Sequence, residues 1–349
     1  MAAAMTTVAL LGYDPCQRSG RRASPAPGPA RSPHANAVSP PLRRLLLLLP
    51  PTPGFLAPSS EPGASSTAAP SCQACLDAPA AAQLVAAALA LLGAVAADVL
   101  GGPASLHLLH AADWGTHAWV ASSLPAEVRA VLGGRLLSDA AICLGLVGWA
   151  AAAAAALGPP APIPSSSGGG SGSAAPAVRQ RLQLRLAAAA SAYALAGGRL
   201  LHADPPLVAA LKEAAHRERP SALLHSWAWP SGHTTAATFI VGALLYLLLP
   251  ELAVLRRAEL AGSEPQQQRQ WQRQPADGLA SALLSSRGWL WPTAIATTAA
   301  GRIIADVHWL SDTLAGACLG CSVVGGTALL CHAIDAALER AAVAAGTQR

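Results

Sequence analysis

Long apolar runs separated by polar or Gly/Pro-rich segments dominate the chain after residue 78. Six such runs cover residues 80–100, 139–157, 184–203, 234–249, 289–304 and 313–334. About 20 apolar residues cross a bilayer as a helix, so the pattern predicts an all-α, multi-pass membrane bundle of about six transmembrane helices. The runs lack the polar face that a soluble bundle would need. Two runs are weaker, because Arg199 lies in the third and Pro292 interrupts the fifth.

The segments outside these runs have different compositions. Residues 1–78 are rich in Ala, Pro, Ser and Arg and poor in acids. They resemble an organellar transit peptide, which predicts a plastid membrane; the alternatives are a disordered cytosolic tail and the endoplasmic reticulum. We expect a membrane domain over residues 79–338. Its Ser/Gly-rich segment 159–176 and its Gln/Arg-rich segment 252–277 are predicted to be flexible loops.

Composition agrees with a membrane protein. Only 12% of residues are charged, against about 25% in a typical soluble domain. No basic stripe interleaved with aromatic residues suggests a nucleic-acid partner. The pairs Cys72/Cys75 and Cys318/Cys321 have a zinc-like spacing, but one lies in the tail and the other inside an apolar run. We therefore expect neither a metal site nor a cofactor.

Counting six spans puts two loops on one side of the membrane, the third-to-fourth and the fifth-to-sixth. The N-terminus and the remaining long loops lie on the other side. Setting aside the basic residues with a chemical role, arginines are more frequent on the N-terminal side. The positive-inside rule then predicts that this side faces the cytosol or stroma.

Three polar clusters in the second half stand out against the apolar background. They read Lys212-x6-Arg219-Pro220, Pro230-Ser231-Gly232-His233 and Gly301-Arg302-x5-His308-x3-Asp312. The six-span topology brings all three to the same membrane face. Each residue alone has an ordinary explanation as an interfacial charge or a helix cap, but a charge inside an apolar run, such as Arg302, is costly and usually functional.

Together these clusters suit a phosphate ester. Lys212, Arg219 and Arg302 supply three cations for a phosphate dianion. A Ser-Gly pair at a helix start offers a hydroxyl and closely approaching backbone amides to the same anion. Lys212 is also the only lysine among 23 basic residues, which suggests that a compact ammonium is needed there and that arginine would not fit.

The histidines complete the chemistry. His308 and Asp312 are four residues apart, so a helical turn would put them on one face, and the carboxylate would fix the imidazole tautomer. His308 could then act as a nucleophile through its other nitrogen. His233 is available to protonate the leaving alkoxide as a general acid.

These residues resemble the three-part signature of the phosphatidic acid phosphatase type 2 and vanadium haloperoxidase superfamily, in its membrane lipid phosphate phosphatase branch. The signature reads Lys-x6-Arg-Pro, Pro-Ser-Gly-His and Ser-Arg-x5-His-x3-Asp. The resemblance implies a phosphohistidine intermediate on His308, with His233 as the acid and Asp312 orienting His308. It also implies that the phosphate is held by the remaining motif residues, Lys212, Arg219, Ser231, Gly232 and Arg302. Gly301 departs from the signature, which usually has Ser, and one hydroxyl donor is lost.

The resemblance leaves the substrate open. We expect a metal-independent phosphatase acting on phosphatidate or a related phospholipid, with the bilayer as its other partner; the oligomeric state stays open. Prenyl or dolichyl diphosphates and sphingoid-base phosphates are alternative substrates. A haloperoxidase is disfavoured by the apolar spans, and a non-catalytic protein by the intact histidines. Trp227 and Trp229 could line a lipid path or anchor the chain at the interface.

Overall fold

The computed structural model describes residues 75–101, 107–158, 175–196, 205–221, 226–263 and 266–347. These residues form helices joined by short turns and contain no strand, so the all-α prediction is confirmed for this part of the chain. Nearly all of the predicted transit peptide and of the predicted loop 159–176 lie outside the described residues.

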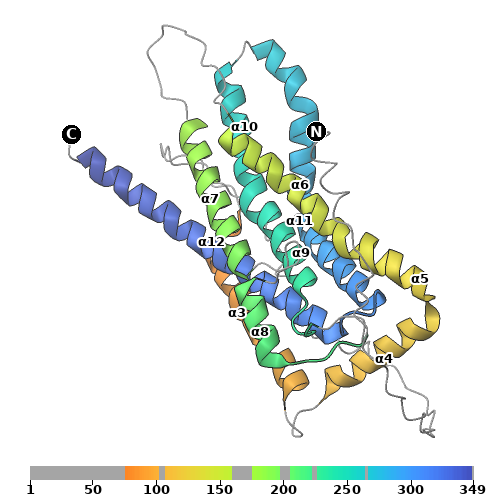
Figure 1. Cartoon of the computed structure of the whole chain (residues 1–349). Helices are drawn as coiled ribbons and strands as arrows, with labels where there is room; N and C mark the ends of the chain where they lie inside the picture. Colours follow the sequence, from red (N-terminus) through yellow and green to blue (C-terminus); the bar gives the residue numbers. More distant parts are fainter. Residues whose placement is uncertain are drawn as a thin grey trace, which may run out of the picture. The chain divides into compact units, whose positions relative to one another are not determined.

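Five of the six predicted runs lie within long helical segments, and the third lies in one as far as residue 196, beyond which residues 197–203 are outside the described part of the chain (Figure 1). The helices are α3 (Ala78–Leu100), α4 (Leu108–Ser123), α5 (Ala126–Val128), the π-helix η1 (Arg129–Leu137), α6 (Ser138–Leu157), α7 (Ala175–Ala196), α8 (Pro206–Ala215), α9 (Gly232–Ala243), the π-helix η2 (Leu244–Leu248), α10 (Leu249–Ser263), α11 (Gln266–Ile304) and α12 (Leu310–Thr347). The runs correspond to α3, α6, α7, α9 to α10, α11 and α12. The short helices α4 and α8 were not predicted.

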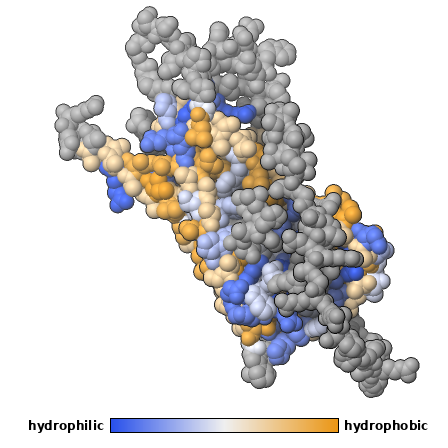
Figure 2. All heavy atoms as spheres, viewed as in Figure 1, coloured by the Kyte–Doolittle hydropathy of each residue, from blue (hydrophilic) through white to orange (hydrophobic). Residues whose placement is uncertain are grey.

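Among the residues that the structure describes, four helical segments are long and apolar enough to cross a membrane. They are Ala78–Leu100, Ala126–Leu157, Gly232–Glu259 and Leu310–Ala344. Large apolar side chains such as Leu144 and Val147 on α6 are exposed, as expected for a surface that faces lipid. Figure 2 shows apolar residues along the visible face, with hydrophilic residues toward its ends. The chain thus has the features of a multi-pass membrane protein, and the count of six spans stays a prediction.

The structure differs from the sequence prediction at the expected flexible loop 252–277. Residues 252–263 belong to α10, and residues 266–277 form the start of α11. Gln, Arg, Ala and Leu are good helix formers, so a low-complexity composition did not imply a loop. Pro292 also lies inside α11 and does not end it. Neighbouring helices in a membrane bundle can compensate for the backbone donor that proline lacks.

Close contact between α9 and α12 depends on two glycines one turn apart on α12. A Cβ atom at Gly316 would lie 2.5 Å from the carbonyl oxygen of Ser231, and one at Gly320 would lie 2.5 Å from Cβ of Thr238. Any larger side chain would separate the helices. This contact sets the start of α12 beside the start of α9, where two of the three polar clusters lie.

Two kinds of contact hold the rest of the bundle together. Indole groups tie neighbouring helices to α9, because Trp149 Nε1 donates to Ile240 O at 2.9 Å and Trp291 Nε1 donates to Thr238 O at 2.8 Å. Away from the polar clusters, Arg185 on α7 donates a hydrogen bond to Asp335 on α12 at 2.7 Å. These contacts fix the helices from which the site is built.

Candidate active site

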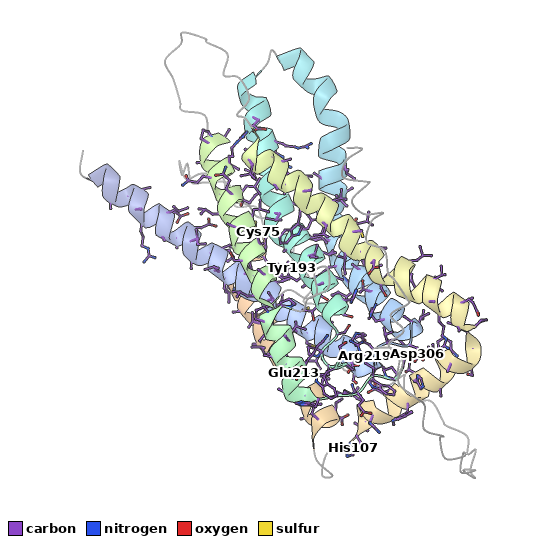
Figure 3. The ribbon with its side chains drawn as sticks, in the orientation of Figure 1. Cys75, His107, Tyr193, Glu213, Arg219 and Asp306 are labelled. Atoms are coloured by element: carbon purple, nitrogen blue, oxygen red, sulfur yellow. The ribbon has the colours of Figure 1, made fainter. Side chains whose placement is uncertain are left out.

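The three polar clusters meet at one end of the bundle. They come from α8 and the segment after it, the start of α9, the end of α11 and the start of α12. Figure 3 labels Arg219 and Asp306 close together at this end, in the lower part of the bundle. His308 lies between α11 and α12 and is 3% exposed.

The turn before His308 is set by the end of α11. Asp306 has a φ of 59°, a left-handed conformation that reverses the chain after the helix. Its carboxylate lies 2.6 Å from Nδ1 of His117 and accepts a hydrogen bond from Arg129 at 3.0 Å. Contacts to α4 and η1 therefore hold the turn that joins Arg302 to His308 in place.

Asp312 is held by the start of α12. Its Oδ2 accepts the backbone N–H of Trp309 at 2.8 Å, a helix-capping bond, and lies 3.5 Å from Nδ1 of His308. The sequence placed His308 and Asp312 on one helical turn. In the structure α12 begins at Leu310, so the two meet because Asp312 reaches back over the helix start.

The opposite side of the His308 ring faces Arg219. Arg219 Nη1 lies 3.1 Å from Nε2 of His308. A guanidinium can only donate, so Nε2 carries the lone pair and the neutral ring has its proton on Nδ1, toward Asp312. This tautomer leaves Nε2 available as a nucleophile.

Four basic residues from all three clusters act on His308. Burial lowers its pKa well below the usual 6.5, and the positive charges of Arg219, Arg302, Lys212 and His233 lower it further. Lys212 and Arg302 are themselves only 5% and 8% exposed. The structure thus gathers the predicted cations around the imidazole, where an anion would be attracted to all of them.

Backbone carbonyls hold Arg219 in place. Its guanidinium donates to Val307 O at 2.6 Å, to Ser226 O at 2.7 Å and to Trp227 O at 3.2 Å. The side chain is therefore oriented without an anion, and it joins the segment after α8 to the loop that carries His308.

Ser231 and Gly232 form the start of α9. Ser231 is the N-cap residue, and its backbone N–H donates to Asp312 O at 3.0 Å. Its amide is thus engaged by α12. The first backbone bond within the helix is Thr235 N to Ser231 O, so α9 itself uses none of the amides of residues 232–234. Such a helix start attracts anions.

His233 follows Gly232 in the first turn of α9 and is partly exposed. Its Nε2 lies 3.8 Å from Oδ1 of Asp139, a residue of α6 that the sequence analysis did not single out. Helix α6 thus brings a carboxylate to the first turn of α9.

Gly301 is explained by a close helix crossing. A Cβ atom at Gly301 would lie 2.6 Å from the backbone N of Ser138 and 2.8 Å from its Oγ. Ser138 is buried and donates to Gly133 O at 2.5 Å. The place that a serine side chain at position 301 would take is therefore filled by Ser138 from α6. The missing hydroxyl reflects how α11 packs.

Comparison with known proteins agrees with this geometry. The family model of the PAP2 superfamily matches residues 186–334, which include every residue of the three clusters. The match supports the PAP2 superfamily. No curated protein and no solved structure matches the chain. Members of the superfamily are phosphatases or haloperoxidases. The match therefore supports phosphatase-type activity on phosphate esters.

The PAP2 signature does not include a buried network behind Asp312. Asp113 on α4 accepts the backbone N–H of Ser311 at 2.9 Å and its hydroxyl at 2.6 Å. Arg217 donates to Asp113 at 2.6 Å and also to Asp312. Sequence reasoning missed both residues. The available signal was that Asp113 is the only acid within 108–123, and that Arg217 lies between two PAP2 motif residues.

Two further sequence expectations bear on this candidate site. Trp229 is buried against Val95 and Ala315, so it does not line an opening, whereas Trp227 is partly exposed and meets His216 edge-on at 4.8 Å between ring centroids. Within the described residues, no group of three or more His, Cys, Asp or Glu side chains is arranged to hold a metal ion.

Proposed function

We propose that the chain is a membrane-embedded lipid phosphate phosphatase that works through a phosphohistidine on His308. The observation that carries the proposal is the placement of His308 between opposite charges. Its Nε2 faces Arg219 at 3.1 Å, and its Nδ1 faces Asp312 at 3.5 Å. One nitrogen is directed at the anion site and the other at a carboxylate, as a nucleophilic imidazole requires.

In the first step the lone pair of His308 Nε2 forms a bond to phosphorus. The bond between phosphorus and the lipid oxygen breaks, and the oxygen leaves with that electron pair. His233 gives it a proton, so the lipid departs as an alcohol. Lys212, Arg219 and Arg302 hold the phosphoryl oxygens, together with the Ser231 hydroxyl and the Gly232 amide.

In the second step a water molecule attacks the phosphorus of the phosphohistidine. His233, now neutral, takes a proton from this water, and the bond between phosphorus and Nε2 breaks. Inorganic phosphate leaves, and His308 returns to its neutral form. Asp312 stabilises the positive charge that the imidazole ring carries while it is phosphorylated. No metal or cofactor enters either step.

A lipid substrate follows from where the proposed site lies. His308 and Asp312 stand at the start of α12, whose apolar segment Leu310–Ala344 is long enough to cross a bilayer. A substrate whose acyl chains stay in the bilayer can bring its head group to that level. We take phosphatidate as the first candidate, ahead of sphingoid-base phosphates and prenyl or dolichyl diphosphates.

The location and organisation of the chain are part of the same proposal. Residues 1–78 direct a membrane domain of residues 79–338, with six spans, to a plastid membrane. Fusing residues 1–78 to a fluorescent protein tests the location. Import into plastids is expected, and a cytosolic signal or one in the endoplasmic reticulum would contradict this part of the proposal alone.

A substrate panel on the purified protein in lipid vesicles tests the activity. We expect phosphate release from phosphatidate without added metal, inhibition by vanadate, and loss of turnover in His308→Ala. An acid-labile, alkali-stable phosphoryl label on the protein would mark the phosphohistidine. Wild-type turnover in His308→Ala would rule out the nucleophile, and no turnover on any phospholipid or prenyl diphosphate would rule out the phosphatase.

A further inference from the structure

A buried chain of charges lies behind the His308–Asp312 pair. Arg217 bridges two carboxylates, with Nη2 at 2.6 Å from Asp113 Oδ2 and Nη1 on Asp312 Oδ1. The Asp113 and Asp312 side chains are 1% and 0% exposed, and that of Arg217 is 12% exposed. Charges this deeply buried are costly unless they are paired, so the chain acts as one unit.

The chain fixes Asp312 through both of its oxygens. Oδ1 accepts from Arg217, while Oδ2 accepts the backbone N–H of Trp309 at 2.8 Å and faces Nδ1 of His308. With both oxygens engaged, the plane of the carboxylate cannot rotate. The direction from Asp312 to the imidazole is therefore set by Arg217.

Arg217 is in turn held from its other side. Asp113 accepts one hydrogen bond from Arg217 and two from Ser311. The Ser311 hydroxyl also accepts a hydrogen bond from Arg217 at 2.7 Å. The guanidinium carbon of Arg217 lies 5.7 Å from the ring centre of Trp309, within cation–π range. Helix α4 thus contributes to the site through Asp113, although it carries no PAP2 motif residue.

The charges of the chain also suit the proposed intermediate. Two carboxylates and one guanidinium sum to one negative charge. The neutral His308 ring becomes cationic when Nε2 bonds to phosphorus, so the buried group is neutral as a whole only in the phosphorylated state. Removing one carboxylate would leave a net positive charge in that state, next to the cations that hold the phosphate.

We infer that Asp113 and Arg217 are positioning residues that orient and charge Asp312, and through it His308, for bonding to phosphorus. The inference rests on the proposed function for its role in turnover. It does not depend on the lipid, because any phosphate ester would meet the same imidazole. Asp113 and Arg217 are not expected to touch the phosphate, which the motif cations hold.

Vanadate and inorganic phosphate separate positioning from anion binding. Vanadate readily accepts a fifth ligand and can bond to Nε2, whereas phosphate is held only by the cations and amides. We expect Asp113→Asn to weaken vanadate binding to the purified protein about tenfold, the lower end of the loss when a group that orients a ligating histidine is removed. Phosphate binding is expected to change less than about twofold. Asn keeps the size of the side chain and an oxygen acceptor for Ser311.

A matched control is available at the other end of the bundle. Arg179 pairs with Glu259 at 2.5 Å and is 16% exposed, close to the 12% of Arg217. Arg179→Gln should leave both affinities unchanged. Arg217→Met should weaken vanadate binding at least as much as Asp113→Asn, and Asp113→Asn decides the question if Arg217→Met fails to fold.

The outcomes are distinct. Equal weakening of vanadate and phosphate in Asp113→Asn would mean a structural role and overturn the inference, as would unchanged vanadate binding. If wild-type protein binds both anions but hydrolyses no lipid, the proposed function fails. The comparison of vanadate with phosphate binding in Asp113→Asn still tests whether Asp113 and Arg217 position His308. If wild-type protein binds neither anion, both proposals fail.

Discussion

Arg219 Nη1 and His308 Nε2 lie 3.1 Å apart, and this contact favours an imidazole whose lone pair is on Nε2. A guanidinium has no lone pair to offer, so it can only donate to an unprotonated Nε2. Burial and the neighbouring cations lower the His308 pKa in the same sense. The His308 imidazole is therefore neutral, as the proposed nucleophile must be, and a bound phosphate dianion would offset the cations that keep it neutral.

The free energy of unfolding should depend on pH because His308 is neutral in the folded protein. The His308 pKa is well below 6.5 in the folded protein and near 6.5 in the unfolded chain. Below pH 6.5 the unfolded chain binds a proton that the folded protein does not, so acid favours unfolding. The contribution of His308 to the free energy of unfolding is constant above pH 6.5 and falls as the pH decreases toward the folded-state pKa.

The measurement compares melting temperatures of wild type and His308→Gln in one detergent between pH 5 and 8. The other histidines are common to both proteins and cancel in the difference. Wild type should lose stability relative to His308→Gln below about pH 6.5, and the difference should be flat above it. A difference that grows in favour of wild type at low pH would mean that His308 is protonated when folded.

Lys212→Arg should keep the charge and lose most of the activity. Lys212 is 5% exposed on α8 and acts on His308 together with Arg219 and Arg302. A second planar guanidinium needs more room than an ammonium and approaches an oxygen with a fork. We expect kcat/KM to fall at least about tenfold, as for misplaced catalytic groups.

Lys212→Met is the companion variant for this prediction, because it removes the charge without adding bulk. If the ammonium holds phosphate, Lys212→Met should raise the inhibition constant of inorganic phosphate, and Lys212→Arg should raise it less. Full activity in Lys212→Arg would mean that the lone lysine has no special role, and the phosphatase proposal would stand.

Most of the fold could be predicted because its signal is local. An apolar run long enough to cross a bilayer is visible in the sequence, and the described residues of all six runs lie in long helical segments. The helical start of α11 was missed because its Gln/Arg-rich sequence has the composition of a linker. Helix α4 was missed because it is short and its role depends on the distant residues Ser311 and Arg217, which sequence spacing does not reveal.

The meeting of the three motif clusters at one end of the bundle could be predicted, whereas the residues that support them could not. Lys212, Arg219 and His308 have fixed spacings that match known chemistry. Asp113 is 198 residues from Ser311, and Asp306 is 189 residues from His117. Only the packing of α4 against the loop before α12 brings these pairs together.

Gly301→Ser should destabilise the protein, although it restores the residue usual in the PAP2 signature. The new Cβ would lie 2.6 Å from the backbone N of Ser138, so α11 and α6 must move apart. Overpacking of this kind costs about 1–3 kcal/mol. Thermal unfolding in detergent should show a lower midpoint for Gly301→Ser.

Gly288→Ser is the matched control, because a Cβ at Gly288, also on α11, would meet nothing within 4 Å. Replacing a glycine within a helix by serine favours the helix, so the unfolding midpoint of Gly288→Ser should be unchanged or slightly higher. If Gly301→Ser had an unchanged unfolding midpoint and bound phosphate more tightly, the packing explanation would be wrong. Gly301 would then differ from the signature only by lacking a hydroxyl that binds phosphate.

His233→Ala should affect substrates according to their leaving groups. A lipid alkoxide is a strong base and needs a proton as it leaves, whereas p-nitrophenolate leaves without one. General acid catalysis typically contributes 10²–10⁴-fold, so kcat on phosphatidate should fall by about that range. The label on His308 should form readily from p-nitrophenyl phosphate in the same variant, since formation of the phosphohistidine then needs no acid.

The same variant also separates the two steps. His233 is proposed to take a proton from the attacking water, so in His233→Ala the phosphohistidine should be made from p-nitrophenyl phosphate and hydrolysed slowly. A burst of p-nitrophenolate equal to the amount of enzyme, followed by slow turnover, is the expected signature. Asp139→Asn, which removes the carboxylate 3.8 Å from His233, should show the same bias more weakly. Equal losses on both substrates without a burst would assign His233 to phosphate binding, because a residue that only holds the phosphoryl group does not distinguish between leaving groups.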